Sequence, residues 1–201
     1  MKTILCFGDS NTYGFRPEDH GRYGRETRWT ALLSEMLRDK GYKVIEEGEN
    51  GRTTVFDDPK SVTRNGKTAL AAILTREEHI DNAIVMLGTN DCKTAFGASA
   101  GEIAKGMETL LSMLKQYDSN MHILLLCPAP MTELAVTDED FDLRSVSVSS
   151  ELSAYYCALA ESEHCEFLDV GQLTSVGKSD GVHLDPFAHL LLAKALASYF
   201  A

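Results

Sequence analysis

Short apolar runs alternate along this chain with longer stretches in which apolar residues recur at helical spacing. Five of the runs have the length of buried strands: Thr3–Phe7, Lys43–Glu47, Ala83–Leu87, His122–Cys127 and Glu166–Asp169. Strands that alternate with helices form right-handed crossovers, which give a parallel sheet covered on both faces. The pattern therefore predicts an α/β fold, a three-layer, flavodoxin-like α/β/α sandwich around a five-stranded parallel sheet.

The stretches between the runs carry apolar stripes typical of helices. The first stripe consists of Trp29, Leu32, Leu33, Met36 and Leu37. Similar stripes fall within residues 103–114 and 152–160, and a weaker helix is expected over Gly66–Arg76.

Capping signals mark two further helix boundaries. Ser99 and Glu102 have the spacing of a capping box, in which each side chain satisfies a free backbone N–H. Asp185 followed by Pro186 predicts the N-cap and first residue of a last helix, which runs to Tyr199.

Three segments are longer than ordinary connections: Arg16–Thr27, Val55–Asn65 and Ala129–Val148. Each follows a strand end or a strand-end motif, and ligands gather at the carboxyl ends of the strands in such sheets. We therefore expect all three segments to border one cleft. The third contains an acidic run: Asp138, Glu139, Asp140 and Asp142. A run of like charges of this kind is typical of a solvated face, which is what we expect here.

The composition narrows the class of protein. A length of 201 residues fits a single domain, residues 1–201, that can bury a real core. The 19 Lys and Arg against 30 Asp and Glu give a formal charge of −11, which argues against a nucleic-acid partner because phosphate binding depends on Lys and Arg. No apolar run approaches the ~20 residues that span a bilayer, so no membrane partner is expected.

Two features indicate a cytoplasmic protein. The apolar run at the N-terminus stops at Gly8 and Asp9, too early for the core of a secretory signal. The five cysteines form no Cys-x-x-Cys pair and no paired framework, which is typical of reduced, mostly buried thiols. We expect no structural zinc site, no other metal and no cofactor.

Four polar segments stand out as candidate chemistry. They are Gly8-Asp9-Ser10-Asn11-Thr12, Gly48-Glu49-Asn50-Gly51-Arg52-Thr53, Gly88-Thr89-Asn90-Asp91 and Asp180-Gly181-Val182-His183. The first three directly follow predicted strands. Together the four contain a serine, a small-residue turn, an amide and an Asp-x-x-His pair, which are the parts that an acyl-transfer site needs.

A serine hydroxyl becomes an effective nucleophile only when a neighbouring base takes its proton. Ser10 sits at a tight strand exit, and His183 can be the base if Asp180 holds its other ring nitrogen and stabilises the imidazolium. Each residue also has a structural interpretation: a helix N-cap for Ser10, a packing role for His183 and a turn for Asp180.

A tetrahedral intermediate places negative charge on the former carbonyl oxygen and needs donors aimed at it. The backbone N–H groups of Ser10 and Gly51 and the side-chain amide of Asn90 can supply three. The alternative interpretations are a positive-φ turn at Gly51 and a loop-tying amide at Asn90.

The four blocks resemble those of the SGNH (GDSL-type) hydrolases, in family order and over nearly the whole chain. Within that family the chain looks closest to the bacterial arylesterase/acyltransferase branch, through the stretches Ile4–Ser10, Arg28–Thr30, Val44–Gly48 and Met86–Asp91. The resemblance implies Ser10 as nucleophile, His183 as base and Asp180 as its orienting partner, with oxyanion donors from Ser10, Gly51 and Asn90. Asn11 stands where the family name has Leu, and we expect this departure to leave the chemistry unchanged.

The implied activity is that of a serine esterase, which hydrolyses short-chain aryl or acetyl esters through an acyl-enzyme on Ser10. Related acyltransferases also pass the acyl group to alcohols. The implied partner is a small-molecule ester, and the resemblance leaves a homo-oligomer open. Tyr13 and Phe15 follow the nucleophile closely and can wall a small acyl pocket, or they can simply pack the first helical turn.

Three further residues lie near the candidate oxyanion donors. Arg52 and Lys93 can bind an anionic substrate group, although charges in such positions more often face solvent or pair with carboxylates. Cys92 is interpreted as a small buried hydrophobic residue.

Two other functions compete with esterase activity. A flavodoxin-like module without hydrolase activity can bind phosphate or flavin at the first strand–helix loop, but this leaves Asp180 and His183 unused. A metal-dependent phosphoesterase can use Asp9, Asn90, Asp91 and His183, but a two-metal site usually needs more ligands than the sequence supplies.

Overall fold

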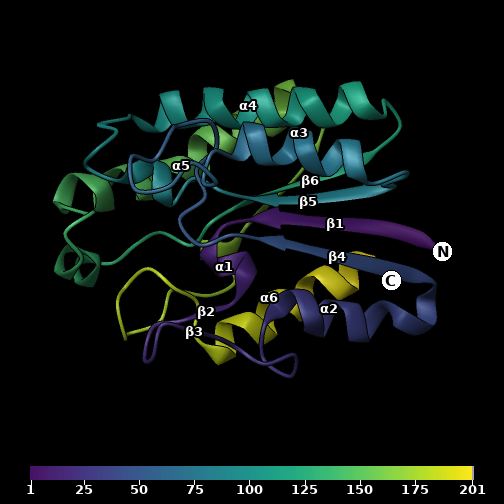
Figure 1. Ribbon diagram of the computed structural model, residues 1–201. Coiled ribbons are helices and arrows are strands. Elements are labelled where there is room, and N and C mark those ends of the chain that lie inside the picture. The colour runs from purple at the N-terminus through teal and green to yellow at the C-terminus, as the bar shows by residue number, and fades with distance from the viewer. Residues whose placement is uncertain (201) are drawn as a thin grey trace.

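Five parallel strands form the central sheet of the computed structural model, which describes residues 1–200 (Figure 1). The strands are β1 (Lys2–Gly8), β4 (Tyr42–Gly48), β5 (Asn82–Met86), β6 (His122–Cys127) and β7 (Glu166–Asp169), in the order β4-β1-β5-β6-β7. All neighbouring pairs are parallel. The predicted fold class is confirmed, and so are the five strands, each to about one residue at its ends.

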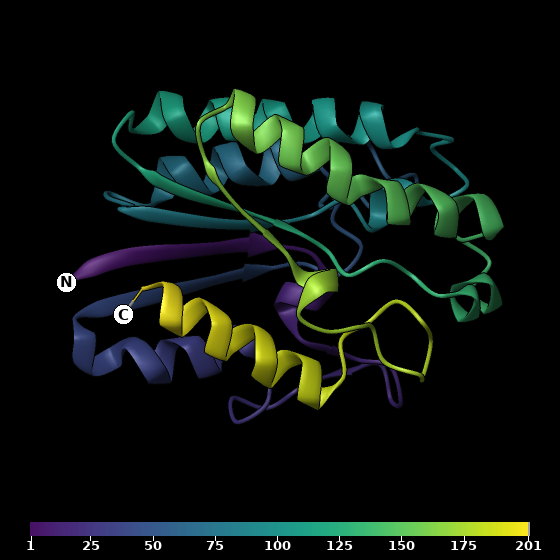
Figure 2. The same cartoon turned by 180° about the vertical axis from the view of Figure 1, so that it is seen from behind.

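Helices cover both faces of the sheet (Figures 1 and 2). On one face lie α2 (Trp29–Leu37) and α6 (Pro186–Tyr199), and on the other lie α3 (Gly66–Arg76), α4 (Ala100–Tyr117) and α5 (Leu143–Ser162). The shorter helical elements are α1 (Ser10–Tyr13), η1 (Arg38–Lys40), η2 (Asn90–Cys92), η3 (Glu133–Thr137) and η4 (Val170–Gln172). No helix within residues 1–200 has the length and apolar character of a membrane span.

The core is divided by the sheet into two layers, and β1 contributes to both. Leu5 and Phe7 pack into the layer beneath α3, α4 and α5, whereas Ile4 and Cys6 pack into the layer beneath α2 and α6. All four side chains are completely buried. Because each strand is anchored on both faces, its carboxyl end is a fixed platform for the loop that follows.

The predicted caps are present. Ser99 and Glu102 form a reciprocal capping box at the start of α4. Asp185 accepts a hydrogen bond from the backbone N–H of Ala188 at 2.9 Å, and Pro186 follows it as the first residue of α6. This last cap sits directly after the loop that carries His183, so it fixes where that loop ends.

Two of the three long segments contain regular structure that the hydrophobic pattern did not predict. In the first, β2 (Phe15–Arg16) and β3 (Gly21–Arg22) form a short antiparallel pair. In the third, α5 begins at Leu143, so the predicted irregular segment was wrong over residues 143–148. The first turns of α5 are rich in serine and show no apolar stripe; Asp142 starts the helix instead, by accepting hydrogen bonds from Ser145.

The order of the strands places a binding crevice at the end of β1. The chain passes from β1 to β4 on one side of it and later to β5 on the other, and ligands bind at such switch points, outside the carboxyl ends of the strands. Figure 1 shows the loops after β1, β4 and β5 at this end of the sheet, opposite the end where β1 starts and α6 finishes.

Candidate active site

Ser10 is positioned by the sharp exit of the chain from β1. Asp9 caps α1 by accepting a hydrogen bond from the backbone N–H of Asn11 at 2.9 Å, and Ser10 is the first residue of that helix. Gly8 is required there, because a Cβ at this position would lie 2.6 Å from the carbonyl oxygen of Met86. Ser10 is therefore not the N-cap, and its hydroxyl is left free to face His183.

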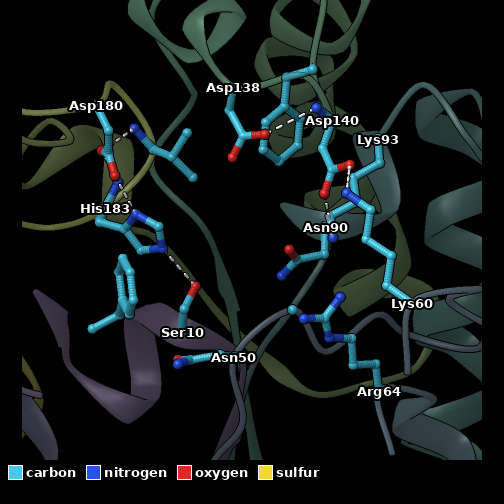
Figure 3. Close-up of a pocket in the computed structure, with 14 residues that line it drawn as sticks. Ser10, Asn50, Lys60, Arg64, Asn90, Lys93, Asp138, Asp140, Asp180 and His183 are labelled. Carbon is cyan, nitrogen blue, oxygen red and sulfur yellow. Dashed lines mark hydrogen bonds and ion pairs between the residues drawn. The ribbon is translucent and has the colours of Figure 1, made fainter. Parts of the chain in front are cut away.

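The hydroxyl, the imidazole and a carboxylate form a continuous hydrogen-bonded chain (Figure 3). Nε2 of His183 lies 2.9 Å from Oγ of Ser10, and Nδ1 lies 2.6 Å from Oδ2 of Asp180. Burial alone would raise the pKa of Asp180. Hydrogen bonds from the His183 ring and from two backbone N–H groups outweigh this effect, so the pKa of Asp180 lies below its ordinary value. An ionised Asp180 only accepts hydrogen bonds, so it keeps a proton on Nδ1 and leaves Nε2 as an acceptor toward Ser10.

Asn11 ties the turn that carries Ser10 to the loop that carries His183. Its Nδ2 donates to the carbonyl oxygen of Val182 at 3.2 Å, and its Oδ1 accepts from the backbone N–H of Leu184 at 2.8 Å. Both contacts flank His183, and the Asn11 side chain is buried. The departure from the family motif, expected to leave the chemistry unchanged, thus places an amide between the two halves of the candidate triad.

The three predicted oxyanion donors belong to Ser10, Gly51 and Asn90, which all line the same pocket. The backbone N–H groups of Ser10 and Gly51 donate to no acceptor within residues 1–200. The Asn90 amide donates one hydrogen to the carbonyl oxygen of Arg52 at 3.1 Å, which fixes its orientation and leaves its second hydrogen free. Gly51 does adopt the positive φ that its alternative interpretation required, at +79°.

A pocket of about 370 Å³ contains these groups (Figure 3). Ser10, Gly51, Asn90, Asp180 and His183 all line it. The other lining residues are Phe15, Asn50, Lys60, Arg64, Lys93, Asp138, Asp140, Phe141 and Val182. His183 and Asp180 form one side, and Arg64, Lys60 and Lys93 reach in from the opposite side. The structure therefore brings all five predicted catalytic and oxyanion residues together.

Of the two residues predicted to wall the acyl pocket, Phe15 lines the pocket and Tyr13 does not. The Phe15 ring lies against the imidazole of His183, with ring centroids 4.5 Å apart, and lines the pocket. The Tyr13 ring lies instead under the guanidinium of Arg22, at 4.5 Å, and does not line the pocket. The side chains of Tyr13 and Phe15 therefore do not form one wall.

The long segments meet around this pocket, with the first at its margin. Lys60 and Arg64 come from the second segment, and Asp138 and Asp140 come from the third. Pro17, Glu18 and His20 of the first segment line an adjoining hollow that shares Phe15 and His183 with the pocket.

The interpretation of the acidic run as a solvated face was wrong for Asp140. Asp140 forms ion pairs with Lys60 at 2.7 Å and with Lys93 at 3.1 Å, and it faces the pocket. Asp142 caps α5. Glu139 remains on the outside, 86% exposed, with Lys60 at 3.2 Å. Long-range pairing, invisible in the local sequence, accounts for the difference.

Of the two basic residues near the donors, only Lys93 behaves as expected. It is buried and pairs with the carboxylates of Asp58 and Asp140. Arg52 neither faces solvent nor pairs with a carboxylate: it is buried, donates to the carbonyl oxygen of Gly8 at 2.9 Å, and stacks over the Phe7 ring at 4.6 Å. Cys92 is completely buried, as predicted.

Two buried carboxyls beneath the site, Asp9 and Asp91, directly adjoin Ser10 and Asn90, and the sequence argument considered them only as possible metal ligands. Burial raises the pKa of Asp9 to about 6 and that of Asp91 to about 7. Asp91 accepts hydrogen bonds from the backbone N–H and the hydroxyl of Thr54, which ties η2 to the loop after β4. Over residues 1–200, no three His, Cys, Asp or Glu side chains are grouped to hold a metal ion.

Comparisons with known proteins agree with this geometry. The model of the GDSL-like lipase/acylhydrolase family matches residues 6–191. Est24, a carbohydrate acetylesterase from Sinorhizobium meliloti, is 34% identical, with a TM-score of 0.93 and 100% of this chain and 98% of that chain covered. The inhibitor-bound aryl esterase of M. smegmatis is 32% identical, with the same TM-score and coverage. A search of curated proteins finds no match.

The chain belongs to the GDSL-like lipase/acylhydrolase family, and with that membership it is a serine ester hydrolase. The resemblance noted in the four sequence blocks is thereby confirmed, including its direction toward bacterial arylesterases. The similarity supports neither acyl transfer to alcohols nor the flavodoxin-like alternative.

Proposed function

We propose that the protein hydrolyses short-chain carboxylic esters through an acyl-enzyme on Ser10, with His183 as general base and Asp180 as its orienting partner. The observation that carries this proposal is the hydrogen-bonded chain from Ser10 Oγ to His183 Nε2, at 2.9 Å, and from Nδ1 to Asp180, at 2.6 Å. Both distances lie within the range of a positioned nucleophile and base.

The reaction then has two halves. In the first, Oγ of Ser10 attacks the carbonyl carbon while Nε2 of His183 takes the hydroxyl proton. The same proton passes to the alcohol oxygen, the C–O bond breaks, and the acyl group stays on Ser10. In the second, His183 takes a proton from water, the hydroxide attacks the acyl carbon, and Ser10 recovers its proton as the carboxylic acid leaves. Asp180 stabilises the imidazolium at both stages.

The negative charge of each tetrahedral intermediate falls on the former carbonyl oxygen. We assign its stabilisation to the N–H groups of Ser10 and Gly51 and to the free amide hydrogen of Asn90. Two observations support this assignment: all three residues line the same pocket, and the hydrogen bond to Arg52 fixes the orientation of the Asn90 amide. Donors that need no reorganisation are worth roughly 10²–10³ each in rate.

The pocket favours a small acyl group and a polar alcohol. Its volume of about 370 Å³ lies near the low end of the range for ligand pockets, roughly 300–1,000 Å³. Phe15 offers an aromatic surface beside His183, where the leaving alcohol must sit to receive its proton. Five charged side chains, Lys60, Arg64, Lys93, Asp138 and Asp140, also line the pocket, and two of the similar structures are a carbohydrate acetylesterase and an aryl esterase. We therefore assign acetyl esters of aryl or sugar alcohols as the substrate class.

The test is hydrolysis of p-nitrophenyl esters from acetate to octanoate, and of a sugar acetate, by the wild type and by Ser10→Ala. We expect turnover to be greatest with the acetates and to disappear in the variant, which should keep its circular dichroism spectrum. Turnover that survives in Ser10→Ala would refute the assigned nucleophile. Preference for octanoate would keep the mechanism and refute the acyl-size assignment.

We also propose that the enzyme works in a reducing compartment such as the cytoplasm. The support is that all five cysteines, which fall within the described residues, are free thiols, three of them buried. A thiol titration of denatured protein from its native cell should give five free thiols, and a lower count would contradict this proposal.

A further inference from the structure

Asp58 lies outside the hydrogen-bonded chain of Ser10, His183 and Asp180, yet its carboxylate is almost completely buried beside the pocket. It belongs to the loop between β4 and α3, and its side chain is 3% exposed. Oδ1 accepts a hydrogen bond from the backbone N–H of Lys60 at 2.8 Å, while Oδ2 contacts Arg64 at 2.8 Å and Lys93 at 3.2 Å. One carboxylate therefore joins two cations that come from different parts of the chain.

The first cation, Arg64, lies against Gly51. The Arg64 guanidinium lies directly over this glycine, because a Cβ built on Gly51 would be 2.5 Å from Nε and 2.7 Å from Cζ of Arg64. Nη1 of Arg64 is bonded to Asp58, so the guanidinium is held at one end while its Nε and Cζ lie against the Gly51 turn. The position of Arg64 thus limits where the Gly51 N–H can move.

The second cation, Lys93, belongs to the turn that carries Asn90. Lys93 closes the η2 turn by donating its backbone N–H to the carbonyl oxygen of Asn90 at 3.2 Å. Its ammonium, buried with only 8% of the side chain exposed, is held between Asp58 and Asp140. Displacement of the Lys93 side chain would therefore act on the turn that carries the Asn90 amide.

We propose that Asp58 is a positioning residue, which holds the Gly51 and Asn90 donors at the mutual spacing that the oxyanion requires. The inference rests on the proposed function of those two donors. Its physical basis is that a donor stabilises the transition state only at the right place, so displacement of about 1 Å can cost on the order of 10²-fold in rate. Burial raises the pKa of Asp58, but bonds from Arg64, Lys60 and Lys93 lower it to about 2, so the carboxylate is charged at neutral pH.

The main test is a double-mutant cycle with Asp58→Asn and Asn90→Ala on p-nitrophenyl acetate. Asp58→Asn keeps the side-chain shape but removes the charge that holds both cations. We expect kcat to fall roughly tenfold or more with KM changed less than about twofold, because the donors act on the transition state. Asn90→Ala should cost ~10²–10³ alone and clearly less in the Asp58→Asn background, since that amide is already displaced. Fully multiplicative effects would overturn the proposal.

Asp57→Asn is the matched control. Asp57 is the neighbouring acid on the same loop; it is exposed, and it accepts a hydrogen bond from Asn65 rather than from Arg64 or Lys93. We expect its kcat to stay within about twofold of the wild type. An equal loss in both variants would mean that any damage to this loop lowers activity, and it would overturn the specific role of Asp58.

Arg64→Lys provides a second route if Asp58→Asn does not fold. Lysine keeps the charge next to Asp58 but lacks the flat group that covers Gly51. We expect a lower kcat with KM nearly unchanged, and an unchanged kcat would count against the proposal. Ser10→Ala separates the two levels of inference: if it is inactive while the Asp58 and Arg64 variants keep full kcat, only the positioning role fails. If Ser10→Ala is active, the proposed function itself fails.

Discussion

At the scale of single residues, the site depends on groups that use part of their hydrogen-bonding capacity for position and keep part for the reaction. Asn90 donates one amide hydrogen to the carbonyl oxygen of Arg52, and its other amide hydrogen is free. His183 is hydrogen-bonded to Asp180 through Nδ1 and to Ser10 through Nε2. Because each side chain is already fixed, no reorganisation is needed when charge develops.

Gly51→Ala tests how far one residue controls the oxyanion site. Its φ of +79° disfavours any L side chain, and the new Cβ would meet Arg64 at 2.5 Å. We expect kcat on p-nitrophenyl acetate to fall at least about tenfold, because the N–H moves when the turn or Arg64 gives way.

Gly97→Ala is the control for backbone strain alone. Gly97 also has a positive φ, +56°, but a Cβ there would meet nothing within 4 Å, and the residue does not line the pocket. This variant should lose about 1 kcal/mol of stability with kcat preserved. Similar kcat losses in the two alanine variants would show that the effect at Gly51 is not local to the site.

At the scale of elements, the site is assembled from loops joined by a few buried bridges. Asn11 joins the β1–α1 turn to the loop before α6 through Val182 and Leu184. Asn11→Leu would leave a buried backbone carbonyl and N–H unpaired, at about 1–3 kcal/mol each. We expect a lower melting temperature and a reduced kcat, because both contacts flank His183.

Asn11→Asp is a second test of this bridge. The carboxylate keeps the acceptor for the Leu184 N–H but sets an oxygen against the Val182 carbonyl, so its melting temperature and kcat should fall below those of the wild type. Wild-type kcat in Asn11→Leu would show that the bridge does not position His183.

The elements also show where prediction from sequence ends. The strands and the candidate triad could be read from the chain, because burial on both faces imposes apolar runs and the chemistry needs particular residue types at strand ends. The start of α5 could not, because its serine-rich first turns depend on the Asp142 cap rather than on an apolar stripe. The Asp58–Lys93 pair could not either, because it joins residues 35 positions apart that no local pattern connects.

At the scale of the whole molecule, buried titratable groups make stability depend on pH. His189 in α6 is completely buried, accepts a hydrogen bond from the backbone N–H of Trp29 at 3.3 Å, and leaves Nε2 without a partner in residues 1–200. Burial lowers the pKa of His189 to about 4, from 6.5. The unfolded chain therefore binds more protons between pH 4 and 6.5, and this group destabilises the fold as the pH falls through that window.

His189→Asn tests this acid sensitivity, since asparagine keeps an acceptor for Trp29 but does not titrate. The loss of unfolding free energy from pH 6.5 to 4 should be smaller in the variant by up to about 3 kcal/mol. Asp9 and Asp91 act in the opposite direction, because their raised pKa values make stability fall as the pH rises from about 4 to 7. The comparison between wild type and variant cancels their contribution. Identical pH profiles would contradict the buried neutral histidine.

The central claim is that Ser10 carries the acyl group, and the most direct measurement is the mass of the protein after rapid acid quenching during p-nitrophenyl acetate turnover. The wild type should gain one acetyl group, which peptide mapping places on Ser10, and His183→Ala and Ser10→Ala should gain none there. An acetyl group on another residue, or full ester turnover by Ser10→Ala, would contradict the mechanism.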